Sequence, residues 1–400
     1  MDPASLAATA MRVSVFGNQS GLGNVARSMK DLAVSRLRSQ RLIGRPFESP
    51  VDAVRCLTAV QSQDYAAAKW ALGQRSRGAT DAEIDRLFDR GDILRTHVMR
   101  PTWHFVLPED IRWLLALTAP RIRQGLVARH RMLELDAPTI TRASAAFAKG
   151  LAGGRHLTRL ELGQVLRAAR ISPEGQRLPH LLMLAELDGL IASGPRRGKQ
   201  FTYALLVERV PESRNLERAD AVAELTRRYF LSHGPAQLQD LVWWSGLTVA
   251  DARAGIKLIG PSLEHIAVDG RDYWFDSDGP GGRMASPVGH LLPNFDEYTV
   301  AYRDRSSLVH PDLPVEPGLF AFGSVLSNVV TIDGRVRGAW RRMSTAQGGV
   351  QVEVRVIKPL ESREVTAVEG AGLRMSRFLE RPVAVGFQKP RHRPFKSFQA

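Results

Sequence analysis

Two glutamines, Gln61 and Gln63, flank Ser62 in the stretch AVQSQDYAAA, where most of the neighbouring residues are apolar. A glutamine amide is too weak a base to take a proton from water at neutral pH, but its carbonyl oxygen accepts a hydrogen bond from water. An amide dipole held in a fixed position also stabilises charge that develops during a reaction. The pair could therefore position a water molecule beside a centre that becomes positively charged.

The spacing of the two glutamines restricts the backbone that carries them. Residues two apart on a helix point about 200° apart, so one regular helix cannot direct both amides at one atom. We therefore predict an irregular turn over residues 61–63, with helix resuming at about Asp64. Asp64, the only carboxylate in the stretch, is a rival site residue, or else a helix N-cap or ion-pair partner. The structural alternative for the glutamines is that they are exposed amides or caps of the neighbouring helix ends.

The surrounding pattern predicts helices closed by a β-hairpin. Ser49 and Pro50 are typical of a helix start, and Thr80 with Glu83 forms the pattern of a capping box. The residues from 93 to 107 are rich in β-branched and aromatic types and are interrupted by Arg100-Pro101, which indicates a hairpin. The predicted helices are 31–43, 50–60, 62–74 and 81–90. Helices followed by a hairpin are typical of a winged helix-turn-helix, so we predict a first winged-helix unit over 31–110.

The same order recurs twice. A second unit, over 111–210, has linking helices, a helix within 156–170 capped by Thr158 with Glu161, a helix over 178–190 and a hairpin over 191–206. A third unit, over 211–276, has helices over 218–230, 235–245 and 248–258. It ends in a hairpin over 263–275 that turns at Asp269-Gly270, a strong two-residue turn signal.

The remaining segments are a flexible leader over 1–30, a linker over 277–283, a β-rich closing element over 284–385 and a basic tail over 386–400. In the closing element we predict strands over 319–330, 336–340 and 350–357, then a helix over 361–379. The predicted fold class is thus α+β, with about three tandem winged helix-turn-helix units and a small β-rich C-terminal element.

The composition indicates the partner. The chain has 55 Lys and Arg against 41 Asp and Glu, a net charge of +14, which favours nucleic acid, with membrane surfaces as the main competitor. The single cysteine, Cys56, excludes an internal disulfide and a cysteine zinc site. No apolar run is long enough for a transmembrane helix, and the start is a poor secretory signal. We expect a cytoplasmic monomer that binds double-stranded DNA, has no cofactor and does not enter membranes.

Several basic residues are candidates for DNA contact. Arg196, Arg197 and Lys199 lie at the tip of the second hairpin, where a winged helix meets a groove or phosphates, although a solvated turn is the alternative. Arg129, His130 and Arg131 form a second candidate patch for phosphate contact, with Arg129 and Arg131 as its principal residues.

His104 is expected to pack or hydrogen-bond beside the glutamines, with DNA contact as the sharper possibility. His97 and His104 have no third clustered ligand, so we predict no metal site. Asp296 and Glu297 resemble an acid pair, but Arg303 and Arg305 favour structural ion pairs for them.

Several stretches of the sequence together resemble a known family. They are Gln61–Gln63 in a run ending at Arg75, RTHVMRPTWH at 95–104, LLPNFDEY at 291–298, YRDR at 302–305, TIDGR at 331–335 and GAWRR at 338–342. Over roughly 35–385 the chain resembles the AlkZ-type family of bacterial winged-helix DNA glycosylases. The family's glutamine-x-glutamine motif falls on Gln61 and Gln63, whereas a sister subgroup has aspartate at the second position.

The resemblance implies a monofunctional DNA glycosylase with Gln61 and Gln63 as catalytic residues. Its substrates would be purines alkylated at N7, including crosslinks, in DNA repair or self-resistance. Such a base is already positively charged before the bond breaks, so a pair of carboxylates is not required. Gln63 would orient the attacking water, and Gln61 would stabilise the sugar cation or hold Gln63. The alternative is a winged-helix DNA-binding protein without catalysis; an enzyme acting on small molecules has no cofactor motif in its favour.

Overall fold

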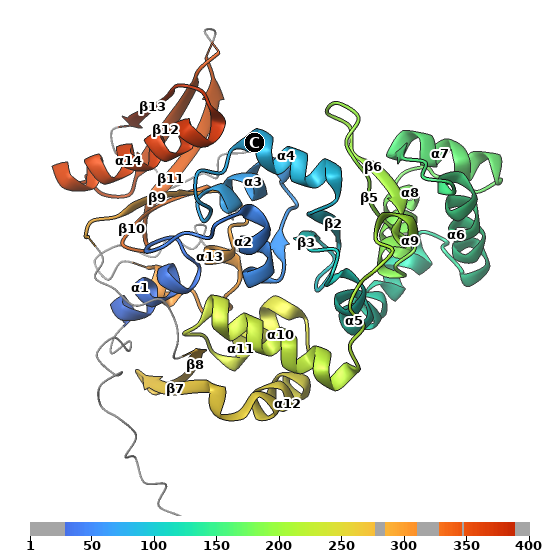
Figure 1. The fold of residues 1–400 in the computed structure, drawn as a ribbon, viewed down its shortest axis with the longest axis horizontal. Coiled ribbons are helices and arrows are strands. Elements are labelled where there is room, and N and C mark those ends of the chain that lie inside the picture. Colours follow the sequence, from blue (N-terminus) through green and yellow to red (C-terminus); the bar gives the residue numbers. More distant parts are fainter. Residues whose placement is uncertain (1–28, 277–284, 310–327, 346–347, 389–400) are drawn as a thin grey trace, which may run out of the picture.

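The computed structural model describes residues 29–276, 285–309, 328–345 and 348–388. The predicted leader, except for its last two residues, and the predicted linker lie outside these ranges. Helices and strands are mixed along the chain, which confirms the predicted α+β class. We call residues 29–110, 111–210 and 211–276 the first, second and third segments, and 285–388 the C-terminal element. Figure 1 shows the first segment (blue) in the middle, with the second (green) and the C-terminal element (orange to red) on opposite sides.

The first segment has four helices and a three-stranded sheet. Its elements are α1 (Met29–Ser39), α2 (Pro50–Leu57), β1 (Val60–Gln61), α3 (Tyr65–Gly73), α4 (Asp81–Arg90), β2 (Leu94–His97) and β3 (Trp103–Val106). The predicted hairpin and the Thr80–Glu83 capping box are confirmed. The helix predicted over 50–60 ends at Leu57 instead, because Thr58 has a φ of 69°. The helix predicted over 31–43 likewise ends at Ser39, and Arg41 has a φ of 55°.

The second segment repeats this sheet after two long helices. Its elements are α5 (Ile111–Met132), α6 (Ala137–Leu151), β4 (Leu157–Thr158), α7 (Arg159–Ala168), α8 (Arg177–Leu187), β5 (Ile191–Ser193), β6 (Thr202–Leu205) and α9 (Leu206–Arg209). The sheet order β4-β6-β5 matches the order β1-β3-β2 of the first segment. The capping box of Thr158 with Glu161 is confirmed. A separate hydrophobic core, which includes Phe147, Leu162 and Leu182, holds α6, α7 and α8 against β5 and β6.

The third segment consists of three helices and a hairpin. They are α10 (Arg218–His233), α11 (Leu238–Ser245), α12 (Val249–Ile259), β7 (Leu263–Val268) and β8 (Arg271–Asp276). The predicted turn at Asp269-Gly270 is confirmed, and both residues have positive φ, 49° and 73°, as a tight two-residue turn of this class requires. The three segments thus share an order of helices followed by a hairpin.

The C-terminal element is a five-stranded sheet covered by one helix. Its elements are β9 (Gly289–Leu292), α13 (Glu297–Val300), β10 (Val329–Ile332), β11 (Arg335–Ser344), β12 (Val350–Val356), α14 (Ser362–Leu379) and β13 (Val383–Gln388). The strands predicted over 336–340 and 350–357 and the helix over 361–379 are confirmed. β9 and β13 were not predicted, and β13 takes the first three residues of the predicted tail. Most of the strand predicted over 319–330 lies outside the described residues.

The hydrophobic cores place the first segment at the centre of the molecule. One core joins α2, α3 and α4 to the C-terminal sheet and α14, through residues such as Trp70 and Phe378. A second core joins β2, β3 and α5 to the helices of the third segment, through residues such as Trp113 and Tyr229. The strand that carries Gln61 therefore lies where three parts of the chain meet.

Candidate active site

The backbone around the two glutamines is not helical. Gln61 lies in β1, opposite His104 of β3, and its N–H donates to Glu297 Oε1 at 2.8 Å. Ser62 continues toward β3 by donating its N–H to the Trp103 carbonyl at 2.8 Å. The predicted departure from a helix is confirmed, although the backbone at Gln61 is an extended strand rather than a turn. Helix resumes as α3 at Tyr65, and Asp64 is its N-cap, accepting the Ala67 N–H at 3.0 Å.

The two glutamine side chains have different surroundings. Gln61 is 6% exposed, and its Oε1 accepts a hydrogen bond from Arg100 Nη2 at 3.1 Å. Gln63 is exposed, and its Oε1 accepts a long hydrogen bond of 3.4 Å from the Trp103 N–H. Neither amide caps a helix, since Thr58 ends α2 and Asp64 begins α3. One glutamine is thus fixed inside the protein while the other faces the solvent.

A buried carboxylate, Glu297, lies behind Gln61. Its Oε1 accepts the Gln61 N–H, its Oε2 accepts the Trp244 indole N–H at 2.9 Å, and His233 Nε2 lies 3.6 Å away. Burial by itself raises the pKa of Glu297, but the neighbouring His233 and the Gln61 N–H outweigh it and hold that pKa below its ordinary value. Glu297 is therefore an anion at neutral pH that fixes the strand carrying Gln61.

The expected ion pairs of Asp296 and Glu297 with Arg303 and Arg305 were wrong. Asp296 pairs with Arg75 at 2.7 Å, with both side chains buried, and Glu297 holds the glutamine strand instead. Sequence reasoning missed this role because the contact spans 236 residues. All four residues of α13, including Glu297, are buried, which the structure reveals and the local sequence does not.

His104 is fully buried next to Gln61. Its Nδ1 lies 2.9 Å from the Thr102 carbonyl. Burial, with a smaller contribution from the charge of Arg100, lowers the pKa of His104 to about 4, so the ring is neutral at pH 7 and donates from Nδ1. The predicted packing beside the glutamines is confirmed. DNA contact by His104 stays a prediction, and the complete burial of its imidazole argues against it.

His97, on the paired strand β2, has different contacts from His104. Its Nδ1 hydrogen-bonds with Glu186, and its ring packs on Trp103 with the centroids 4.5 Å apart. Within the described ranges, no group of three or more His, Cys, Asp or Glu side chains is placed to hold a metal ion. Over the same ranges, no helix is long and apolar enough to cross a bilayer.

A further arginine fixes the backbone of the motif. Arg95 is 9% exposed and donates to the carbonyl oxygens of Ser62 at 3.0 Å and of Gln63 at 3.4 Å. Its guanidinium also lies 4.2 Å from the ring centroid of Trp103 and 4.8 Å from that of Phe201. Arg95 thereby limits the motion of the segment that presents Gln63. Arg95 begins the stretch at 95–104 that carries part of the family resemblance, but it was not among the predicted site residues.

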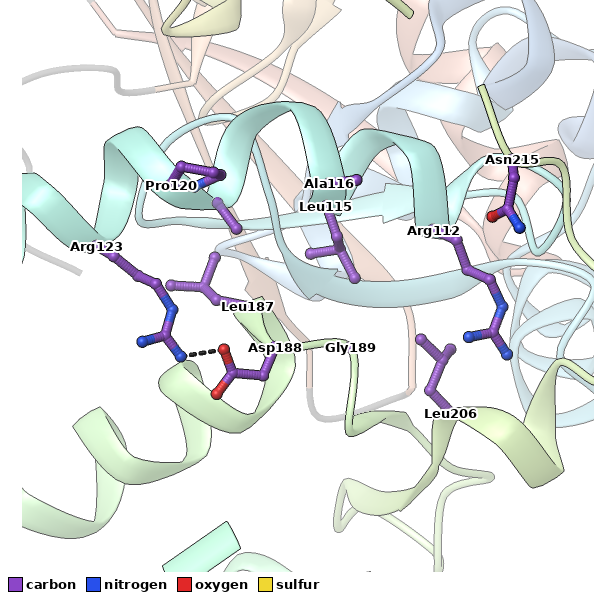
Figure 2. Close-up of a pocket in the computed structure, with 11 residues that line it drawn as sticks. Arg112, Leu115, Ala116, Pro120, Arg123, Leu187, Asp188, Gly189, Leu206 and Asn215 are labelled. Carbon is purple, nitrogen blue, oxygen red and sulfur yellow. Dashed lines mark hydrogen bonds and ion pairs between the residues drawn. The ribbon is translucent and has the colours of Figure 1, made fainter. Parts of the chain in front are cut away.

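Two of the pockets lined by described residues bear on where the reaction occurs. Trp103 helps to line one of about 300 Å³, together with His97, Pro101, Leu126, Arg159, Pro179, His180, Leu182, Met183 and Tyr203. Because the Trp103 N–H bonds Gln63, this pocket adjoins the glutamine motif. The other, of about 560 Å³, lies between α5 and the end of α8, where Arg123 pairs with Asp188 and Arg112 points inward (Figure 2). No residue of the glutamine site lines it, so its size alone does not make it the reaction site.

The predicted DNA-contacting residues of the hairpin tip differ in exposure. Arg196 is only 17% exposed and pairs with Asp85 and Asp89 of α4, each at 2.9 Å. Arg197 is 55% exposed and pairs with Glu161 at 2.8 Å, and Lys199 is exposed. Arg196 thus binds the first segment, leaving Arg197 and Lys199 to face solvent. DNA contact by these three residues stays a prediction.

The second predicted patch lies at the end of α5. Arg129 and Arg131 are exposed in the last turn of this helix, with the buried His130 between them. The structure places this patch and the hairpin tip in one segment, and the base of the tip reaches the region of the motif, since the Arg196 guanidinium carbon lies 5.6 Å from the ring centroid of Tyr65. DNA contact by Arg129 and Arg131 also stays a prediction.

Charge is distributed unevenly among the segments. The second has 16 Lys and Arg against 7 Asp and Glu, a net charge of +9. Residues 31–110 have 12 against 11, a net charge of +1, and residues 211–276 have 7 against 10, a net charge of −3. Most of the +14 of the whole chain therefore lies in the second segment rather than in the segment that contains the glutamines.

Comparison with known proteins gives consistent results. A family model described as "DNA glycosylase AlkZ-like" matches residues 54–378. A Streptomyces sahachiroi protein named "Interstrand DNA cross-link repair glycosylase" is 25% identical over 330 residues, which are 78% of this chain and 87% of that protein. The solved structure of Streptomyces sahachiroi DNA glycosylase AlkZ has a similar fold, with a TM-score of 0.73 at 21% identity, over 90% of this chain and 100% of that one.

Proposed function

The chain belongs to the AlkZ-like DNA glycosylase family, and from this premise we propose that it hydrolyses the N-glycosidic bond of purines alkylated at N7 in double-stranded DNA. The observation that carries the proposal is the pair Gln61 and Gln63 on extended and irregular backbone, with a buried amide beside an exposed one. Membership of the family weighs against a DNA-binding protein without catalysis.

The proposed reaction needs little acid assistance. In an N7-alkylguanine the base carries a positive charge, so cleavage of the C1′–N9 bond releases a neutral base. The bonding electrons stay on the base, and positive charge develops on the sugar. Water adds its oxygen to C1′ and loses one proton to solvent, leaving an abasic site. A neutral amide suits this step because it places the water without supplying a strong acid or base.

We assign the two amides different roles in this reaction. Gln63 is exposed and accepts only a long hydrogen bond, so its amide is available to orient the attacking water. Gln61 accepts from the Arg100 guanidinium, and a neighbouring cation opposes the use of the same oxygen to stabilise a sugar cation. In the free protein, Gln61 therefore serves to hold the motif in place rather than to face the sugar.

We also propose how DNA is held. The three segments of helices followed by a hairpin would act as winged-helix units, with the second, at +9, supplying most phosphate contacts. Arg129, Arg131, Arg197 and Lys199 are the exposed candidates for these contacts. If about six phosphates are neutralised, affinity falls by about three decades or more between 50 and 200 mM salt.

The substrate range would include crosslinks. The Streptomyces sahachiroi relative is named for interstrand cross-link repair, and here Gln63 lies at the surface rather than in a closed cavity. An open site accepts a base that carries a bulky group or is tied to the opposite strand. We therefore place both simple and crosslinked N7-alkylpurines in the proposed substrate class.

The test is base release from a duplex with one N7-methylguanine. After incubation with the protein, alkali and heat convert abasic sites into strand breaks. The wild type is expected to give breaks, and the double variant Gln61→Ala/Gln63→Ala is expected to give only background. Tight binding by the wild type without breaks above this control would favour the non-catalytic alternative.

A further inference from the structure

Among the described residues, two guanidinium groups near the glutamine motif form hydrogen bonds to neutral oxygens rather than ion pairs with carboxylates. Arg100 follows β2 and Arg305 follows α13, and their guanidinium carbons lie 6.0 Å and 5.7 Å from the ring centroid of the same residue, Trp243. Neither forms an ion pair within 4.0 Å with a carboxylate of the residues that the structure describes. Their hydrogen-bond acceptors are the neutral oxygens of Gln61, for Arg100, and of Thr299, for Arg305.

This arrangement differs from that of three of the four most buried arginines in the described residues, whereas the fourth, Arg95, likewise donates to neutral carbonyl oxygens. Arg36, Arg75 and Arg228 each pair with a buried aspartate, at 3.6, 2.7 and 2.6 Å respectively. Buried cations in proteins are normally paired in this way, because an unpaired charge is costly to remove from water. Arg100 also leaves its buried Nε without an acceptor. Burial lowers the pKa of both Arg100 and Arg305, and the charge of Arg100 lowers that of Arg305 further.

The residues of this cluster come from separate parts of the chain that pack closely together. Gly246, at the end of α11, lies so near the 98–102 loop that an added Cβ would meet the Met99 carbonyl oxygen at 2.5 Å. Trp243 of α11 donates its indole N–H to the Val300 carbonyl of α13 at 3.1 Å. These contacts fix the loop, α11 and α13 against one another. Arg100, Trp243 and Arg305 thus form a built, half-buried cationic surface beside the glutamine motif.

We propose that Arg100 and Arg305 bind the backbone phosphates that flank the target nucleotide, an inference that rests on the proposed function of the glutamine site. A phosphodiester supplies the anionic oxygens that both guanidinium groups lack, and a guanidinium binds such oxygens in a planar, two-pronged geometry. These contacts are distinct from those of the second segment, because they set the position of one nucleotide relative to Gln61 and Gln63.

The binding of phosphate also changes the state of Gln61. A charge-assisted hydrogen bond to phosphate is stronger than one to a neutral amide oxygen, so phosphate competes with Gln61 for Arg100. When Arg100 turns to the phosphate, the Gln61 oxygen is released and a cation is withdrawn from it. Correct placement of the DNA backbone would then free Gln61 to face the positive charge that develops on the sugar.

The experiment replaces single phosphates by neutral methylphosphonates. Duplexes carry one methylphosphonate, either next to the target nucleotide or one helical turn away. Affinity is measured by fluorescence anisotropy on duplexes with a tetrahydrofuran abasic-site analogue, and base release on N7-methylguanine duplexes. For the wild type, we expect at least a tenfold loss of affinity at one flanking phosphate and none at the distant one. Arg100→Met is expected to bind the unmodified duplex as weakly as the wild type binds the modified one, with no further loss from the methylphosphonate.

Controls separate this account from loss of folding or of general charge. Arg303→Met removes the same charge two residues before Arg305, from an exposed side chain, and should keep the wild-type profile. If Arg100→Met does not fold, Arg100→Lys is used instead. Because it keeps a cation, it is expected to retain part of the loss of affinity that the flanking methylphosphonate causes.

A flat profile for the wild type, or an equal loss in wild type and Arg100→Met, overturns the proposal. The dependence of affinity on methylphosphonate position is measured without base release. A wild type that shows this dependence but releases no base therefore contradicts the proposed function while supporting the phosphate site.

Discussion

The first and second segments each begin their sheet with a two-residue strand placed before a helix, Val60–Gln61 as β1 and Leu157–Thr158 as β4. In the second segment, Thr158 is also the N-cap of α7, and its side chain accepts the Glu161 N–H. In the first segment, residues 62–64 separate the strand from α3, and Asp64 supplies the cap. Thr158, the polar residue of β4, thus caps a helix, whereas Gln61, the polar residue of β1, caps none.

The same two segments differ in charge. Residues 31–110, which hold the glutamines, are nearly balanced at +1, whereas the second segment carries +9. The two segments thus share a three-stranded sheet of the same order, but one carries the neutral glutamine amides and the other carries an excess of cations. Catalysis and most of the binding of DNA should therefore be separable by mutation, and the predictions below test that separation.

The largest effect is expected at the glutamines themselves. Gln63→Ala should lower the single-turnover rate of base release by about 100-fold or more, the size of effect seen when one preorganised polar group is removed from an active site. Gln61→Ala should cost less, because Gln61 is bonded to Arg100 in the free protein and is released to face the sugar only when phosphate binds Arg100. Affinity for DNA should stay within about threefold for both, since neither residue is charged. A parallel loss of rate and affinity would contradict separate roles.

The next effect concerns the carboxylate behind Gln61. Glu297→Ala leaves the Gln61 N–H and the Trp244 indole N–H buried without an acceptor, which should cost about 3 kcal/mol of unfolding free energy. Glu297→Gln keeps one acceptor oxygen and should cost less. Urea unfolding of both variants measures the difference. The matched change in the second segment, Glu161→Ala, affects a carboxylate whose side chain is 34% exposed and should be the mildest of the three. Equal losses would refute the comparison.

A third effect is expected from the cations of the second segment. Arg129→Gln/Arg131→Gln should weaken DNA binding about tenfold at low salt and reduce the slope of log affinity against log salt by about 2, because two phosphate contacts are lost. The rate of base release at saturating protein should not change. Anisotropy titrations over a range of salt concentrations measure the slope, and an unchanged slope would remove this patch from the DNA interface.

A smaller effect is expected at the helix cap. Thr158→Ala removes the side chain that accepts the Glu161 N–H and should lower the unfolding free energy by about 1 kcal/mol, a typical value for an N-cap. Base release by the folded protein should stay at the wild-type rate. Thermal unfolding together with an activity assay well below the melting temperature tests both parts. Loss of activity in the folded variant would show that β4 does more than complete α7.

The last effect depends on pH. His104 has a pKa of about 4 when folded against an ordinary value of 6.5, so the unfolded chain binds its proton first as pH falls. The stability that the neutral ring contributes is complete above 6.5 and is lost between 6.5 and 4. From pH 7 to 5.5 this amounts to about 1 kcal/mol. His104→Asn should lose that much less stability than the wild type over this interval.

Local signals predicted much of this fold. The capping boxes at Thr80 and Thr158, the turn at Asp269-Gly270 and the hairpins were recognisable because each depends on residues close together in sequence. The helix end at Leu57 was missed because it depends on a left-handed Thr58 and on a two-residue strand that exists only by pairing with β3. β9 and β13 are short strands whose partners lie far along the chain, so no local pattern marks them.

The candidate site could be predicted only in part. The spacing of Gln61 and Gln63 required a backbone that is not helical, and Asp64 was recognised as a cap candidate. Glu297 and Arg305 could not be assigned to the site, because they reach it from more than 200 positions away. The internal pairing of Arg196 was hidden for the same reason, since its partners Asp85 and Asp89 lie in another segment.

The central claim is that the neutral glutamines carry out the reaction while the cations of the second segment hold the DNA. The most direct measurement takes the rate constant of base release at saturating protein, and the DNA affinity, for Gln61→Ala/Gln63→Ala and for Arg129→Gln/Arg131→Gln. We predict that the first variant binds as tightly as the wild type and releases no base above background, while the second binds more weakly and reacts at the wild-type rate once bound. Loss of both properties in both variants, or base release by the first, would contradict the account.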